Sequence, residues 1–125
     1  MTMKYTVLCS LLLLFCFSCK DNAPKEITII DKGFLQENAI GKEVQLIDVR
    51  TQEEYESGHI GDAVNFNIID NASFLNQIES LDKDEPVYLY CKMGGRSSRA
   101  AQLLKENGFS EIYDYSGGYN DWVTE

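Results

Sequence analysis

The stretch Val87-Tyr88-Leu89-Tyr90-Cys91-Lys92-Met93-Gly94-Gly95-Arg96-Ser97-Ser98 decides the fold of this chain. Its first four residues are aromatic, aliphatic or β-branched and follow a proline, which predicts a short buried strand. Two glycines then break the pattern. A helix is expected over 96–107, with its free N–H groups near Ser97 or Ser98, and Gly108 ends it. A buried strand that leads directly into a helix is typical of a parallel sheet.

The same alternation continues on both sides of this stretch. Further strands are expected at 27–30, 44–49, 63–66 and 112–115. Helices are expected at 32–39, at 51–57 with Thr51 as the cap, at 74–81, and around Trp122. We therefore expect a single α/β domain, with a central, mostly parallel five-stranded sheet and helices on both faces.

The N-terminal residues are expected to lie outside this domain. Residues 7–17 are apolar except for Ser10, but the run is shorter than the roughly 20 residues of a membrane-spanning helix. Together with Lys4 it predicts a secretory signal peptide over 1–18; a buried N-terminal helix is the alternative. Ser18 directly before Cys19 resembles the cleavage box of bacterial lipoproteins, in which the cysteine is acylated. The resemblance implies a lipidated Cys19, a tether over 19–25, a domain over 26–125, and a membrane-anchored protein facing the periplasm or the cell surface.

Charge and cysteine content narrow the function. The chain has 11 basic and 20 acidic residues and a formal charge of −9, which argues against nucleic acid or anionic lipid headgroups as partners. After signal removal and acylation of Cys19, Cys91 would be the single free thiol. No cluster of histidines and cysteines predicts a metal site, and we expect no cofactor.

The position of Cys91 indicates a reactive thiol. A parallel sheet binds ligands at the carboxyl edge of its strands, where Cys91 stands. Gly94-Gly95 let the backbone curl so that N–H groups and the start of the next helix face the sulfur. Such donors favour the thiolate. The alternative is an inert core cysteine followed by an ordinary turn.

Residues Cys91 to Arg96 resemble the six-residue active-site loop of rhodanese domains. Three more segments resemble that family in the same order, at 46–55 (LIDVR followed by EEY), 58–65 (GHIGDAVN) and 115–122 (YSGGYNDW). The resemblance covers residues 26–122, nearly all of the expected domain. Gly61-Asp62 departs from the family's Pro-Gly pair, and the chain ends three residues after Trp122. Neither departure touches the loop.

The resemblance implies a rhodanese-like fold and a sulfurtransferase. The Cys91 thiolate would take a sulfur atom from a small anionic donor such as thiosulfate and pass it from a persulfide to a thiol, including a protein thiol, or to cyanide. The loop that would bind the substrate comprises Lys92, Met93, Gly94, Gly95, Arg96 and Ser97. Arg96 and Lys92 are expected to bind the anionic donor, with solvated surface residues as the alternative.

Three further residues have expected roles outside the loop. Asp48 and Arg50 are expected to brace the active-site region without reacting. His59, the one histidine in the sequence, invites a general-base role, but a preformed thiolate needs no base, so a structural role in the turn is expected.

Three other functions stay open at this point. Phosphatases and arsenate reductases also cradle an anion beside a cysteine, but they place five residues between cysteine and arginine, and this chain has four, Lys92 to Gly95. A non-catalytic rhodanese-like binding module is a second alternative, although such modules typically lack the cysteine. The third is a persulfide carrier or sensor whose partner is another protein.

Overall fold

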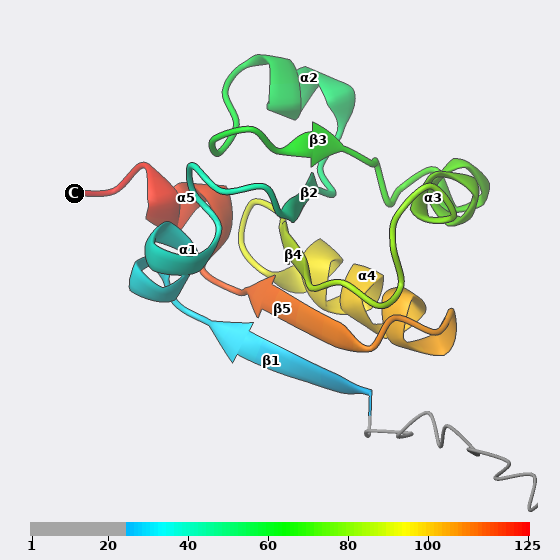
Figure 1. Ribbon diagram of the computed structural model, residues 1–125. Coiled ribbons are helices and arrows are strands. Elements are labelled where there is room, and N and C mark those ends of the chain that lie inside the picture. The colour runs from blue at the N-terminus through cyan, green and yellow to red at the C-terminus, as the bar shows by residue number, and fades with distance from the viewer. Residues whose placement is uncertain (1–24) are drawn as a thin grey trace, which may run out of the picture.

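A computed structural model describes residues 25–125, in which five strands alternate strictly with five helices (Figure 1). In chain order the elements are β1 (Glu26–Ile30), α1 (Lys32–Asn38), β2 (Gln45–Asp48), α2 (Gln52–Glu56), β3 (Val64–Asn65), α3 (Asn71–Ile78), β4 (Val87–Tyr90), α4 (Gly95–Glu106), β5 (Glu111–Tyr115) and α5 (Gly118–Trp122). The expected signal peptide, Cys19 and most of the tether lie outside the described residues. None of the helices in the described part is long and apolar enough to cross a membrane.

The five strands form one sheet in the order β1-β5-β4-β2-β3, and every neighbouring pair is parallel. The predicted α/β class is confirmed, and the sheet is parallel throughout because a helix lies between each strand and the next. β4 is the central strand, and all four of its residues are buried. Its position explains why residues 87–90 read as a continuous apolar run.

Helices cover both faces of the sheet, as predicted. On one face, α3 and α4 pack on the sheet through a cluster that includes Phe74, Leu89, Cys91, Ala101 and Leu104. On the other face, residues of α1 and α5 pack against the tyrosines of β4 and β5. Trp122 is partly buried and packs against this second cluster.

Most element boundaries differ slightly from the prediction, and the differences at α3, β3 and α4 are the clearest. Helix α3 spans residues 71–78 rather than 74–81, because Asp70 accepts a hydrogen bond from the Ser73 N–H and fixes the N-terminus earlier. Strand β3 has two residues, half of the predicted length. Helix α4 begins at Gly95, ahead of the serines, because Gly94 ends the loop with φ of +101°.

The predicted cap of α2 is confirmed. Thr51 accepts a hydrogen bond from the Glu54 N–H, and the Glu54 side chain accepts one from the Thr51 N–H. This capping box fixes Glu54 at the edge of the sheet where the strands end.

Candidate active site

Three strands deliver their carboxyl ends to one edge of the sheet. Asp48 ends β2, Cys91 follows β4, and the Gly117-Gly118 turn follows β5. Because β4 is paired in register with both neighbours, these segments meet at the same level. The structure therefore brings together Cys91, the loop after it and the expected supporting residues Asp48 and Arg50.

The loop after Cys91 wraps around its sulfur. The Cys91 side chain is only 1% exposed, and the Gly94 N–H donates a hydrogen bond to Sγ over 3.0 Å. Gly94 has φ of +101°, and a Cβ there would lie 2.5 Å from the Ser116 carbonyl oxygen. Only glycine fits this position, and it is the residue that turns the Gly94 N–H toward the sulfur.

The surroundings of Cys91 favour the thiolate. Burial by itself would raise the pKa of the Cys91 thiol, but hydrogen bonds from the Ser97 N–H and hydroxyl and from the Gly94 and Met93 N–H groups outweigh it and hold the pKa below its ordinary value. The pKa is lowered because these donors interact more strongly with the charged sulfur than with the neutral thiol. The site can therefore carry a nucleophilic sulfur anion.

The turn into α5 holds the loop from outside. The Tyr119 N–H donates to the Cys91 carbonyl over 2.8 Å, and the Asn120 N–H donates to the Lys92 carbonyl over 3.1 Å. Gly118 has φ of +68°, and a Cβ there would lie 2.5 Å from the Lys92 carbonyl oxygen. The two loop carbonyls are thereby occupied by α5. The sequence contained the Gly117-Gly118 signal, but no spacing rule connects it to the backbone of residues 91–92.

Arg96 is not a free cation. Its guanidinium forms two hydrogen bonds with the Glu54 carboxylate, of 2.7 and 2.9 Å. The hydrogen bond from Arg96, with smaller contributions from the Thr51 hydrogen bonds, lowers the pKa of Glu54 to about 2, although burial by itself would raise it. The expected binding of an anionic donor by Arg96 stays a prediction, and the structure adds that α2 supplies a carboxylate matched to its guanidinium. Sequence reasoning missed Glu54 as a site residue, although it falls in the recognised EEY segment.

The remaining loop residues are exposed except for Ser97. Lys92 and Gly95 are exposed, and Met93 is 72% exposed at the tip of the loop. Ser97 is fully buried, and its hydroxyl donates to the Gly94 carbonyl over 3.1 Å. Gly94 therefore contacts the sulfur directly, and the Ser97 hydroxyl holds the Gly94 carbonyl from the buried side of the loop.

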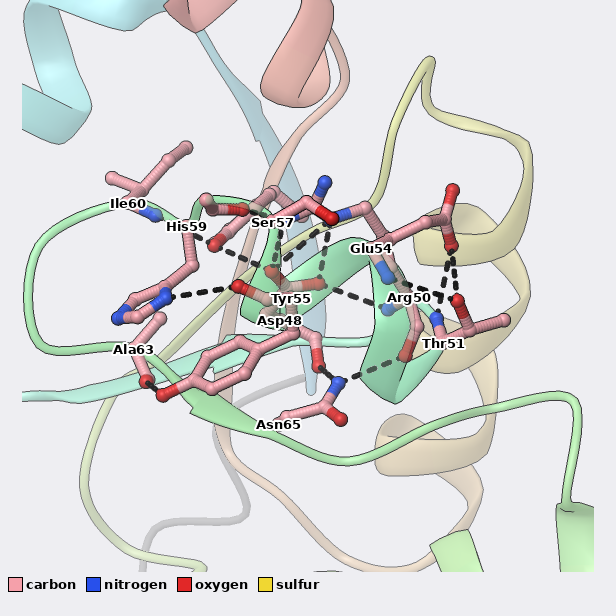
Figure 2. Close-up of polar contacts among 12 residues, drawn as sticks. Asp48, Arg50, Thr51, Glu54, Tyr55, Ser57, His59, Ile60, Ala63 and Asn65 are labelled. Carbon is pink, nitrogen blue, oxygen red and sulfur yellow. Dashed lines mark hydrogen bonds and ion pairs between the residues drawn. The ribbon is translucent and has the colours of Figure 1, made fainter.

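Asp48 and Arg50 form a buried brace next to the loop (Figure 2). The Asp48 carboxylate accepts hydrogen bonds from the Arg50 guanidinium over 2.7 Å and from the Tyr90 hydroxyl, also over 2.7 Å. Arg50 also donates to the Gly58 carbonyl over 2.6 Å and lies 4.2 Å from the centre of the Tyr119 ring. The pair thus connects β2, β4, the turn at Gly58 and α5.

His59 takes part in the turn and not in the loop. Its Nδ1 lies 3.1 Å from the Tyr55 carbonyl oxygen, and its ring stacks on the Tyr55 ring with centroids 4.0 Å apart (Figure 2). The Tyr55 hydroxyl in turn donates to the Ala63 carbonyl over 2.7 Å. These contacts fit a structural role for His59.

A pocket of about 380 Å³ opens beside the loop. Lys92, Tyr119 and Asn120 form one side, and Glu53, Glu54 and Ser57 contribute from α2 and its end. A larger pocket, of about 430 Å³, lies between α2, β3 and α3 and contains no loop residue, so the smaller one is the candidate substrate entrance. Within residues 25–125, no group of three or more His, Cys, Asp or Glu side chains is placed to hold a metal ion.

Comparison with known proteins gives a consistent result. A family model described as a rhodanese-like domain matches residues 31–125. The uncharacterized protein YqhL of Bacillus subtilis is 46% identical over 81 residues, which cover 65% of this chain and 62% of that protein, so the chain spans less than two thirds of this relative. The thiosulfate sulfurtransferase GlpE of Shewanella oneidensis is 38% identical over 81 residues, 65% of this chain and 77% of that protein.

The fold has a close counterpart among solved structures. A rhodanese-like domain protein from Staphylococcus aureus superposes with a TM-score of 0.68 at 29% identity, over 78% of this chain and 93% of that one. The parallel five-stranded sheet with helices on both faces is therefore the architecture of this group of proteins.

Proposed function

Because the chain belongs to the rhodanese-like domain family, we propose that it is a sulfurtransferase that carries a sulfur atom on Cys91 as a persulfide. One observation carries the proposal: backbone and side-chain donors converge on a buried sulfur. They stabilise the thiolate before the reaction and the persulfide anion after it. The relative named thiosulfate sulfurtransferase supports the choice of reaction.

The first half-reaction transfers the outer sulfur of a donor such as thiosulfate. The Cys91 thiolate attacks that sulfur, a new S–S bond forms, the S–S bond of thiosulfate breaks, and sulfite leaves with the electron pair. The product is Cys91 with one added sulfur atom that carries the negative charge. No proton moves in this step, which is consistent with a histidine that is engaged in a turn.

The second half-reaction returns the thiolate. An acceptor thiolate or cyanide attacks the terminal sulfur of the persulfide, and the S–S bond to Cys91 breaks with its electron pair on Cys91 Sγ. The pocket beside the loop has room for a small acceptor, and the exposed Met93 offers an apolar contact to a protein that presents a thiol. No cofactor is needed, since no net oxidation or reduction occurs.

The loop side chains have different roles in this proposal. Arg96 fastens the loop to α2 through Glu54, and Lys92, which is exposed, is the loop cation that attracts an anionic donor. The Asp48–Arg50 pair braces the edge on which the loop stands. Ser97 stabilises the charged sulfur directly.

The length of the loop favours sulfur transfer over phosphatase or arsenate-reductase chemistry. Four residues separate Cys91 from Arg96, and Arg96 is occupied by a carboxylate. A loop of this length makes a smaller cradle, which suits a single sulfur atom better than a phosphoryl group.

The test measures the intermediate itself. Purified protein treated with thiosulfate is expected to gain the mass of one sulfur atom on the peptide containing Cys91, and to release sulfite continuously when cyanide is present. Cys91→Ser is expected to show neither, while Lys92→Ala is expected to keep the added sulfur and to raise KM for thiosulfate. Wild-type protein that gains no sulfur but hydrolyses an aryl phosphate would contradict the proposal.

We further propose that the protein is exported and anchored by a lipid on Cys19. The support is the sequence of residues 1–19. Metabolic labelling with a radioactive fatty acid is expected to mark the wild-type protein in the membrane fraction. Cys19→Ser is expected to lose the label and the membrane association together, and a label that remains in this variant would contradict the proposal.

A further inference from the structure

The two outer strands of the sheet differ in how much free backbone they offer to another strand. β3 has two residues, which is too short to hold a partner. β1 has five, Glu26–Ile30, and among residues 25–125 it pairs with β5 alone. Figure 1 shows it as the outermost strand of the sheet. Alternate residues of such a strand direct their N–H and C=O groups away from the sheet, where another chain can pair with them.

The side chains of β1 favour pairing on this free side. Ile29 is 62% exposed, and Thr28 is exposed as well. Both are β-branched, and such residues are enriched in paired strands. The backbone stays extended through Asp31, which has φ of −99° and ψ of 176°. The strand contains no proline, and Glu26 is its one charged residue, so the usual devices that prevent pairing are few.

A second copy of the chain fits β1 in one register. Two identical strands that pair antiparallel are related by a two-fold axis perpendicular to the sheet, which keeps each face of the sheet on its own side. Residues directly opposite each other then lie on the same face, so their numbers are both even or both odd. Centring the pair on Thr28 uses all five residues of β1. Centring it on residue 27 or 29 uses three.

The residues that meet in this register are complementary. Ile29 of one copy lies opposite Ile27 of the other, and Ile27 packs against the cluster that α4 covers, so the exposed isoleucine gains an apolar neighbour. Just outside the strand, Lys25 lies opposite Asp31. Neither of these two forms a salt bridge within residues 25–125. The two-fold axis makes each contact twice, which gives four favourable pairs.

We propose that the chain pairs with a second copy of itself through β1, antiparallel and centred on Thr28, so that the two five-stranded sheets become one. The carboxyl ends of the other strands, with the loops after Cys91, then point in opposite directions in the two copies and stay open to substrates. A contact between two short strands is at the small end of protein interfaces, so we expect a weak dimer with a dissociation constant of about 0.1 mM. The inference does not depend on the proposed function.

Sedimentation equilibrium of the full chain, from about 10 µM to about 1 mM, measures the association. The average mass is expected to rise from that of one chain toward that of two. Ile29→Lys places a charge opposite Ile27 and diagonal to Lys25 of the other copy, and is expected to raise the dissociation constant at least about tenfold. Ile69→Lys is the matched control, because Ile69 is 64% exposed and lies outside β1, and it is expected to leave the association unchanged.

An exchange of charges tests the register. In Lys25→Glu, and equally in Asp31→Lys, like charges face each other at both ends of the pair, so each variant alone is expected to associate more weakly than wild type. An equimolar mixture of the two restores opposite charges at both ends and is expected to associate more tightly than either variant alone. Asp31 also caps α1; if Asp31→Lys fails to fold, the comparison of Ile29→Lys with Ile69→Lys still decides.

Three results would each overturn the proposal. The first is a chain that stays monomeric at about 1 mM. The second is an association that Ile29→Lys weakens no more than Ile69→Lys does, which would place the contact elsewhere, including residues 1–24. The third is a mixture of folded charge variants that associates no better than either one alone. Sulfur transfer is assayed at concentrations where the chain is monomeric, so none of these results bears on the proposed function.

Discussion

Replacing Gly94 by alanine tests whether the geometry of the loop depends on this glycine. The same replacement at Gly95, the next residue, is the matched control. At Gly94 the φ of +101° and the 2.5 Å approach to the Ser116 carbonyl oxygen leave no room for a Cβ. At Gly95 nothing lies within 4 Å of the added atom. The two variants differ by one position and make the same chemical change.

The magnitudes follow from these contacts. Strain in a glycine-only conformation together with overpacking is expected to lower the free energy of unfolding by about 2–5 kcal/mol in Gly94→Ala. Gly95→Ala is expected to leave it unchanged or raise it by up to about 1 kcal/mol, because alanine favours the helix. Losing the Gly94 hydrogen bond to the charged sulfur is expected to raise the pKa of Cys91 by about one to two units.

Two measurements check this prediction. Urea unfolding gives the free energies, and the pH dependence of iodoacetamide alkylation gives the pKa of the thiol. Sulfur transfer at neutral pH is expected to fall in Gly94→Ala and to persist in Gly95→Ala. If both variants were equally stable and their thiols titrated alike, the reasoning that Gly94 shapes the sulfur's surroundings would be refuted.

Three further predictions concern the contacts around the loop. Glu54→Gln is expected to destabilise the protein by about 1 kcal/mol at neutral pH. Because the folded-state pKa of Glu54 is lowered to about 2, the stabilisation is present above the unfolded-state pKa and disappears as the pH falls toward 2. The urea midpoints of variant and wild type should therefore converge near pH 2, and a constant gap between them would contradict the pairing of Glu54 with Arg96. Tyr90→Phe leaves the buried Asp48 carboxylate and the Ile60 N–H each without one partner, and calorimetry should show a loss of about 1–3 kcal/mol. Tyr113→Phe, on the same sheet face, removes only an exposed hydrogen bond to Glu111 and should cost less. Gly118→Ala forces the added Cβ against the Lys92 and Cys91 carbonyls and should reduce sulfur transfer. Gly41→Ala is the control, because Gly41 has a similarly positive φ but open space around the added atom. Equal activity in the two variants would show that α5 does not hold the loop.

The sequence predicted the fold well because its signals are local. Continuous apolar runs such as 87–90 require burial on both faces, and Thr51 with Glu54 is a capping pattern that spacing alone reveals. The apolar spacing of residues 74–81 predicts a helix that starts too late, because the side chain of Asp70 sets the true start. The predictions about residues before 25 stay predictions.

The sequence predicts the residues at the centre of the candidate site but not the residues that contact them from other elements. Cys91 and the glycines after it are adjacent in sequence, so their arrangement follows from strand, turn and helix. The contact between Arg96 and Glu54 joins residues 42 positions apart, and the contacts of α5 with the carbonyls of Cys91 and Lys92 involve backbone atoms. Side-chain identity carries little information about such long-range backbone contacts, and it gave no indication that Arg96 would be neutralised.

The clamp of α5 on the loop also has a consequence for how the protein is made. The two N–H groups that occupy the loop carbonyls belong to residues 119 and 120, which a ribosome adds well after Cys91. We expect a nascent chain that has not yet exposed these residues to hold Cys91 as an ordinary, sluggish thiol. Activation of the sulfur would then wait until residues 119 and 120 pack on the loop, so that shorter nascent chains are spared premature oxidation.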